Sequence, residues 1–282
     1  MNTSKNSLFK ETPTPEKDLW LVGVFDVLGF SARVKKDGVD KVYNDYQSLL
    51  KNVLNKPAID TGGMYERVPE AGAGAGVFSM GGEISVNSTY FSDTILLWLP
   101  FKPGGRKIFL QRCADLICEA LVMRIPLRGA IALGEGYMHK ATGIYLGQHI
   151  VDAARLEEAQ EQLGIGLTMS AASSPLIPSV EPTQYIEYDI PIKQDLSTNE
   201  KPEYWSPCVL DWARHWRNCE YGDLIQCLTE LRPKEERFAK YYNNAIKFVE
   251  WSIAHNDWHK YPEKQSDFKY IKPYNPKKEN GV

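Results

Sequence analysis

Two aspartates stand at the ends of apolar runs, where a buried strand would deliver a carboxylate to the edge of a core. Asp26 follows the run Leu19 to Phe25, and Asp93 precedes a second run, Ile95 to Leu99. An unpartnered charge beside a hydrophobic core is costly, so each carboxylate needs a partner. Divalent cations such as Mg²⁺ prefer hard carboxylate oxygens. The two acids therefore predict a shared cation site, provided that the fold brings the two strand ends together.

The segments that must position these acids read as alternating strands and helices, beginning with a strand over 19–26. A helix follows and is ended by Pro57; its buried face is predicted from apolar residues at helical spacing, namely Val39, Val42, Tyr43, Tyr46, Leu49, Leu50 and Val53. Residues 86–99 predict a hairpin around Ser92-Asp93. If that extended run is unbroken, one side of it holds Thr89, Phe91, Asp93, Ile95 and Leu97.

The remaining core elements continue this alternation. They are expected as a helix over 106–123, a strand over 127–133, a turn at 134–136, a short strand over 136–139, a helix over 147–162 and a strand over 165–169. This order describes an α+β, ferredoxin-like sandwich, in which helices cover one side of a mainly antiparallel sheet.

Composition divides the chain into three parts. Residues 1–18 form a polar lead-in, and residues 19–182 form the core domain, with a glycine-rich insertion at about 60–84. From residue 183 to residue 282 the chain is aromatic-rich and includes a periodic helix at about 234–255. We expect this C-terminal extension to pack on the core or on a second subunit.

Charge and cysteine usage exclude several classes of protein. The 282 residues are 43% hydrophobic with a net charge of -3, so the chain is globular and lacks the basic surplus typical of nucleic-acid binding. Five cysteines without a C-x-x-C pair favour neither a disulfide framework nor a zinc site. No apolar stretch approaches the roughly 20 residues of a membrane span. These features predict a cytoplasmic protein that does not bind a membrane.

Four segments in order resemble the class III nucleotidyl cyclases. Residues 25–31, FDVLGFS, are similar to the family's metal-acid strand and turn, and Ser92-Asp93 to its second metal-acid hairpin. Residues 127–135, LRGAIALGE, resemble its G-I-x-x-G-E strand. Residues 145–157 resemble its Y-x-G-x-x-V-N-x-A-A-R-L-E helix. The likeness spans about residues 19–170 and implies the class III catalytic domain.

The resemblance implies a nucleoside triphosphate substrate whose ribose 3′-hydroxyl attacks its own α-phosphate. Asp26 and Asp93 match the ligands of two divalent ions, Mg²⁺ or Mn²⁺, with the Val27 carbonyl as a third ligand. Arg155 matches the transition-state arginine, which acts on the other subunit's nucleotide and so implies a homodimer with active sites at the subunit interface. The triphosphate would be held by backbone N–H groups of Leu28, Gly29, Phe30 and Ser31.

Several positions depart from the family pattern. The ribose-orienting Asn is replaced by Val151, with Asp152 or Gln148 as substitutes. The pair that reads a purine aligns with Thr89 and Ile144, and neither family pair is present. The resemblance is therefore greater to the pyrimidine cyclases of bacterial Pycsar antiphage systems. These make cUMP or cCMP from UTP or CTP as a second messenger, which a separate effector reads.

Other interpretations remain open. Asp26 also fits a plain turn acid, since Asp is common before a glycine turn. Arg155 fits a surface ion pair within its helix. Lys193 would meet the triphosphate as a family lysine does, or be a solvated surface lysine. A purine cyclase with an atypical base pocket, and a catalytically silent nucleotide-binding module, are the alternative functions. Residues 81–84, GGEI, are too incomplete a match to indicate a diguanylate cyclase.

Overall fold

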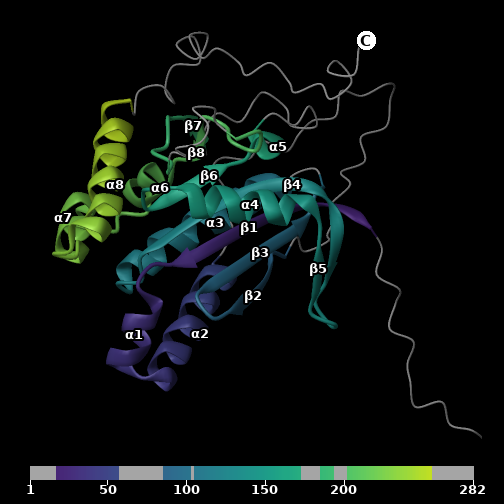
Figure 1. The fold of residues 1–282 in the computed structure, drawn as a ribbon, viewed down its shortest axis with the longest axis horizontal. Coiled ribbons are helices and arrows are strands. Elements are labelled where there is room, and N and C mark those ends of the chain that lie inside the picture. Colours follow the sequence, from purple (N-terminus) through teal and green to yellow (C-terminus); the bar gives the residue numbers. More distant parts are fainter. Residues whose placement is uncertain (1–16, 57–84, 103–104, 173–184, 194–201, 256–282) are drawn as a thin grey trace, which may run out of the picture.

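The apolar run before Asp26 forms the central strand of the sheet, β1 (Asp18–Val27). The computed structural model describes residues 17–56, 85–102, 105–172, 185–193 and 202–255. β1 pairs antiparallel with β3 (Thr94–Pro100) on one side and β4 (Leu127–His139) on the other. The eight-stranded sheet has the order β2-β3-β1-β4-β6-β8-β7, with β5 attached to β4 (Figure 1). β6 (Gly164–Leu167) runs parallel to β4, so the sheet is mixed and the fold is α+β.

Helices cover both faces of this sheet, which corrects the expectation of one covered side. The first face packs against α2 (Val39–Asn55) and α3 (Gly105–Val122) through a buried cluster that includes Leu21 and Phe25 of β1. The alternate residues Val22 and Val24 belong to a second buried cluster with Leu156 of α4 (Gln148–Ala159). Figure 1 shows α4 lying across β1 and β4. Both faces of β1 are buried, which explains its nearly continuous apolar sequence.

The helix predicted to end at Pro57 corresponds to α2. α2 buries Val42, Tyr46, Leu49, Leu50 and Val53, whereas Val39 and Tyr43 from the predicted face are exposed. A preceding helix, α1 (Phe30–Asp37), is absent from the sequence prediction, because it is only eight residues long and its apolar face consists of Phe30 and Val34, which are only partly buried against the core.

The predicted hairpin exists, but its side-chain pattern differs from the prediction. β2 (Asn87–Phe91) and β3 flank the turn at Ser92-Asp93, where Ser92 has a φ of 56°. Phe91 lies opposite Thr94, and Thr89 opposite Leu96. The turn breaks the alternation, so Ile95 and Leu97 face α2 and α3 while Thr89 and Phe91 lie on the other side.

The predicted turn at residues 134–136 is wrong, because β4 continues unbroken to His139. Gly134 and Gly136 remain paired with β1, opposite Trp20 and Asp18. Their lack of a side chain serves close packing: a Cβ at Gly136 would lie 2.2 Å from the Leu146 carbonyl oxygen. The chain then turns back as β5 (Ile144–Leu146), a strand that the sequence prediction does not include.

The chain after residue 183 continues the same sheet and adds helices. β7 (Tyr185–Glu187) and β8 (Cys208–Leu210) extend the sheet beyond β6. The short helix α5 (Met169–Ala172) precedes them; three helices follow, α6 (Trp212–Asn218), α7 (Leu224–Leu231) and α8 (Glu236–Ala254). α6 packs on α3, and Trp212 meets Phe248 of α8 with ring centroids 5.9 Å apart. The predicted lead-in up to residue 16 and the glycine-rich insertion lie outside the described residues. Within the described ranges, no helix is both long and apolar enough to cross a membrane.

Candidate active site

Asp26 and Asp93 come together where β1 ends beside the β2–β3 turn. Asp26 is the penultimate residue of β1 and lies opposite Thr94, the first residue of β3. The Val27 N–H donates to the Asp93 carbonyl oxygen over 2.9 Å, which ties the turn to the end of β1. The two acids that the sequence singled out are therefore neighbours across an antiparallel strand pair.

The electrostatic environment of Asp26 is that of a partly buried acid beside a second acid. Burial is the main cause that raises the pKa of Asp26; the Arg128 guanidinium opposes this rise and the Asp93 charge adds to it. Like charges close together disfavour ionisation of both groups, and a bound cation removes that penalty. Asp26 and Asp93 are thus arranged so that a divalent cation would stabilise their ionised forms.

The donor set fits Mg²⁺ or Mn²⁺ in a site that the substrate completes. Within the described ranges, no group of three or more His, Cys, Asp or Glu side chains is placed to hold a metal ion. Mg²⁺ is commonly bound by one or two carboxylates together with substrate phosphates and water, so two hard carboxylates suffice. Val27, the predicted third ligand, is the last residue of β1, directly between Asp26 and the turn that follows.

Arg128 is a site residue that the sequence prediction missed. It lies opposite Asp26 in the β1–β4 register, and its Nε is 3.3 Å from Asp26 Oδ2 and 2.6 Å from Glu157 Oε1. The shorter contact is an ion pair and not a directed hydrogen bond, since the Nε–H does not point at the oxygen. Its Nη1 also donates to the carbonyl oxygens of Glu158 and Gln160, at 3.3 and 3.2 Å. The signal in the sequence is a single arginine in an apolar strand, which must find a partner.

Glu157 completes a buried charge cluster with Asp26 and Arg128. Burial raises the pKa of Glu157 to about 7; the Arg128 charge opposes this rise and the Asp26 charge adds to it. Two carboxylates therefore share one guanidinium at the end of β1. We call Asp26, Arg128 and Glu157 the charge cluster.

The turn predicted to cradle phosphates supplies fewer donors than expected. Gly29 has a φ of 76° and is the N-cap of α1, without a side-chain cap. First-turn N–H groups of a helix have no intrahelical acceptor, so Phe30 and Ser31 remain available with Gly29. The Leu28 N–H is already committed to the Pro126 carbonyl oxygen at 3.0 Å, which removes Leu28 from the predicted set of donors.

The predicted base-reading positions are not together within one chain. Thr89 is on β2 and Ile144 on β5, and the sheet order places β3, β1 and β4 between them. Ile144 is 48% exposed. A site that uses both positions therefore needs a second copy of the chain to supply one of them.

Arg155 lies on α4 with an exposed side chain and has no ion pair with the charge cluster in the described part of the chain. The Arg155 charge acts instead on Tyr204: burial raises the pKa of Tyr204, and the Arg155 charge opposes that rise. Of the two predicted substitutes for the ribose-orienting Asn, Gln148 donates to Asp152 over 2.9 Å. Lys193 is exposed, yet its charge is among those that lower the pKa of Asp26, which places it near the charge cluster.

Comparisons with known proteins give limited similarity. No protein-family model matches the chain, and no curated protein matches it. Among solved structures, one similar chain is the catalytic core of a rhodopsin-guanylyl cyclase with converted specificity, in complex with ATPαS. That chain superposes with a TM-score of 0.39 at 11% identity, over 61% of this chain and 86% of the other. At this level of similarity, any function has to be argued from the residues of this chain.

Proposed function

We propose that this protein is a metal-dependent nucleotidyl cyclase, which converts a nucleoside triphosphate to a 3′,5′-cyclic nucleotide and pyrophosphate. The observation that carries the proposal is the juxtaposition of Asp26 and Asp93 at the end of β1. When bound, two divalent ions supply charge neutralisation at the α-phosphate and lower the pKa of the attacking 3′-hydroxyl. Asp26 and Asp93 hold those ions, with the Val27 carbonyl as a further ligand.

The neighbouring residues position the substrate and the acids. The N–H groups of Gly29, Phe30 and Ser31 at the start of α1 bind the triphosphate. Lys193 adds a positive charge whose effect reaches Asp26. Positioning and charge stabilisation account for most of the catalysis expected in such a phosphoryl transfer.

A homodimer would complete the site. Arg155 is exposed on α4 and makes no ion pair with the charge cluster, as expected for a side chain that serves the partner's nucleotide. The β4–β5 hairpin has an exposed apolar surface: Tyr137 and Leu146 are directly opposite one another on β4 and β5, and are 38% and 59% exposed. Ile144 shares that side of the hairpin. We propose that a second copy packs on this surface, and that Thr89 of one subunit and Ile144 of the other form one site.

The substrate within this class is proposed to be a pyrimidine nucleotide, UTP or CTP. Thr89 and Ile144 stand where a purine cyclase carries Lys with Asp, or Glu with Cys or Ser. A threonine hydroxyl both donates and accepts, so Thr89 can bond the edge of uracil or cytosine. The product, cUMP or cCMP, would act as a second messenger in antiphage defence, read by a separate effector.

The test is incubation of the protein with each of the four radiolabelled ribonucleoside triphosphates and Mn²⁺. We expect a cyclic pyrimidine nucleotide and pyrophosphate from the wild type, and none from Asp93→Asn. Asp40→Asn, which alters an exposed acid on α2, is the matched control and should retain full activity. A purine cyclic nucleotide as the main product would favour the purine cyclase. No product from any nucleotide would favour the silent binding module, a function that the Arg128 contact with Asp26 also permits.

A further inference from the structure

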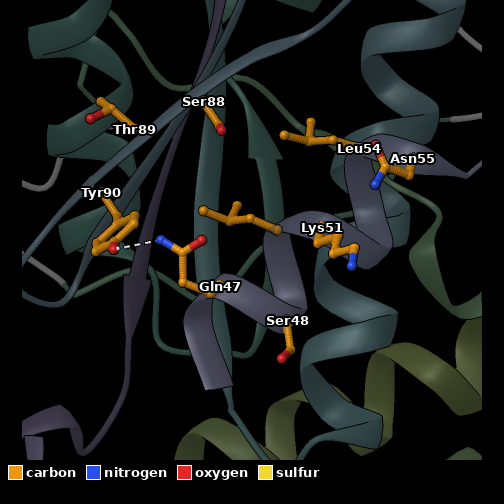
Figure 2. A pocket seen from close by; sticks show the side chains of 9 residues that line it. Gln47, Ser48, Lys51, Leu54, Asn55, Ser88, Thr89 and Tyr90 are labelled. Carbon is orange, nitrogen blue, oxygen red and sulfur yellow. Dashed lines mark hydrogen bonds between the residues drawn. The ribbon is translucent and has the colours of Figure 1, made fainter. Parts of the chain in front are cut away.

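A cavity of about 770 Å³ lies between α2 and the edge strand β2, apart from the charge cluster (Figure 2). Ser88 and Tyr90 of β2 lie opposite Leu97 and Ile95, whose side chains belong to the core that α2 and α3 cover. Asp26 is on the alternate side of the sheet, opposite Thr94. The cavity and the Asp26 side chain are therefore on different faces of the same sheet.

The lining has the chemistry of a site for a small anion that also forms several hydrogen bonds. None of the nine lining residues is an acid, and Lys51 is the one basic side chain among them. Lys51 has no ion pair or hydrogen bond within the part of the chain that the structure describes. Carboxamides and hydroxyls come from Gln47, Ser48, Asn55, Ser88 and Tyr90, and an apolar base from Leu50 and Leu54. Thr89 also lines the cavity, but its side chain lies on the other side of β2. One unopposed cation among neutral donors is complementary to a ligand with one negative charge.

The size of the cavity agrees with a ligand as large as a mononucleotide. Small-molecule sites have volumes of roughly 300 to 1,000 Å³. Carboxamide side chains donate and accept at once, as the edge of a heteroaromatic base requires. A 3′,5′-cyclic mononucleotide has a single negative charge and such a base. The cavity therefore fits the class of product that the proposed function makes.

The cavity is connected to the loop that carries Asp93. The Gln47 carboxamide donates to the Tyr90 hydroxyl over 3.1 Å, as Figure 2 shows. Tyr90 is three residues before Asp93 in the same hairpin, and its ring contacts Tyr46 edge-on with centroids 5.8 Å apart. The centroid of the Tyr46 ring in turn lies 6.1 Å from that of Phe30, the first residue of α1. A ligand that displaces Gln47 from Tyr90 would act directly on the hairpin that holds one of the two acids.

We propose that this cavity is a second nucleotide site, which binds a 3′,5′-cyclic mononucleotide through Lys51 and so regulates the catalytic acids. The identity of the ligand rests on the proposed function, whereas the existence of the site rests on the cavity itself. Occupancy would be sensed through Gln47 and Tyr90. The regulated step is the positioning of Asp93.

Binding is measured by calorimetry on the full chain carrying Asp93→Asn, in which one of the two catalytic acids is removed. The probes are cUMP, cCMP, cAMP and inorganic phosphate. We expect at least one cyclic nucleotide to bind more tightly than phosphate. Lys51→Gln should weaken that binding about tenfold, the loss of one charge-assisted contact. Lys247→Gln, which alters an exposed lysine on α8, is the matched control and should leave binding unchanged.

Two results would overturn the second site: no saturable binding of any cyclic nucleotide, or equal binding by the Lys51→Gln and Lys247→Gln proteins. Ser48→Trp, which fills the cavity from an exposed helical position, should abolish binding while the thermal midpoint stays within a few degrees of the parent. Unchanged affinity in that variant would also contradict the proposal. If a Lys51-dependent cyclic nucleotide binds to a chain whose wild type converts no triphosphate, the second site stands and the cyclase proposal fails.

Discussion

Arg128 of β4 is paired with Asp26 of the adjacent strand β1, and its Nε lies 3.3 Å from Asp26 Oδ2. The same nitrogen is 2.6 Å from Glu157 Oε1, so two partly buried carboxylates share one positive charge. This contact holds the Asp26 carboxylate in one direction before any substrate arrives. Arg128 is therefore a positioning residue for a proposed metal ligand. The consequences for stability and for pH dependence can be measured without substrate.

Replacing Arg128 with methionine should destabilise the protein strongly. Arg128→Met keeps the apolar stem but leaves Asp26 and Glu157 without their shared partner. Removing one member of a buried ion pair costs about 3 kcal/mol or more in the free energy of unfolding. Urea unfolding followed by circular dichroism measures the loss.

The control for this change is Arg124→Met. Arg124 is paired with Glu230 at 3.8 Å, but both side chains are more than half exposed. An exposed pair contributes less than about 1 kcal/mol. A loss at Arg128 no larger than the loss at Arg124 would show that the charge cluster does not stabilise the fold.

Glu157 should make stability fall as pH rises from about 5 to 7. Its pKa is raised from 4.5 to about 7 in the folded chain, mainly by burial, so the folded state holds a proton that the unfolded state has released. Stability therefore decreases with pH across that interval, by on the order of 2 to 3 kcal/mol. In Glu157→Gln the carboxamide imitates the protonated acid. This variant should match the wild type at pH 5 and exceed its stability at pH 8.

Denaturant unfolding of both proteins at pH 5, 6, 7 and 8 measures this difference. Glu250→Gln is the control, since Glu250 is exposed on α8, its charge is not among those that shift the pKa of Glu157, and its substitution should leave the pH profile of the wild type unchanged. Parallel profiles for the wild type and Glu157→Gln would refute a raised pKa at Glu157.

Residue patterns predicted the acids but not their partners. Asp26 and Asp93 are visible because the first follows one apolar run and the second precedes another, a local property of the chain. Arg128 and Glu157 join them only through the β1–β4 register and the packing of α4, which are long-range properties. The same limit explains the wrong turn at residues 134–136: glycines that serve close packing in a long strand resemble the glycines of a turn.

The apolar surface of the β4–β5 hairpin should hold the dimer together. Leu146→Asp places a charge in that surface, and we expect the protein to become monomeric by sedimentation velocity. Ile253→Asp is the control, because Ile253 on α8 is similarly exposed, 49% against 59% for Leu146, but lies outside the hairpin. A wild-type chain that is monomeric at micromolar concentration, or a Leu146→Asp protein that stays dimeric, would remove this surface as the interface.

Shared sites make a prediction about mixed dimers. Asp26→Asn and Arg155→Ala should each be inactive alone, the first for want of a metal ligand and the second for want of the arginine supplied to the partner. In a mixed dimer, one site combines the wild-type Asp26 of one subunit with the wild-type Arg155 of the other, and the second site carries both defects. Random exchange makes half of the dimers mixed, so cyclase activity should recover to about a quarter of the wild-type value.

The two proteins are mixed after brief dissociation, and mass spectrometry of differently tagged chains measures the mixed fraction. Mixing Asp26→Asn with Asp93→Asn is the control: each of these variants spoils a ligand of its own subunit's site, so no intact site forms. If the mixed dimer of Asp26→Asn and Arg155→Ala forms and remains as inactive as this control, then Arg155 does not act across the interface. In that case Arg155, exposed on α4, either acts within its own subunit or has no role in catalysis.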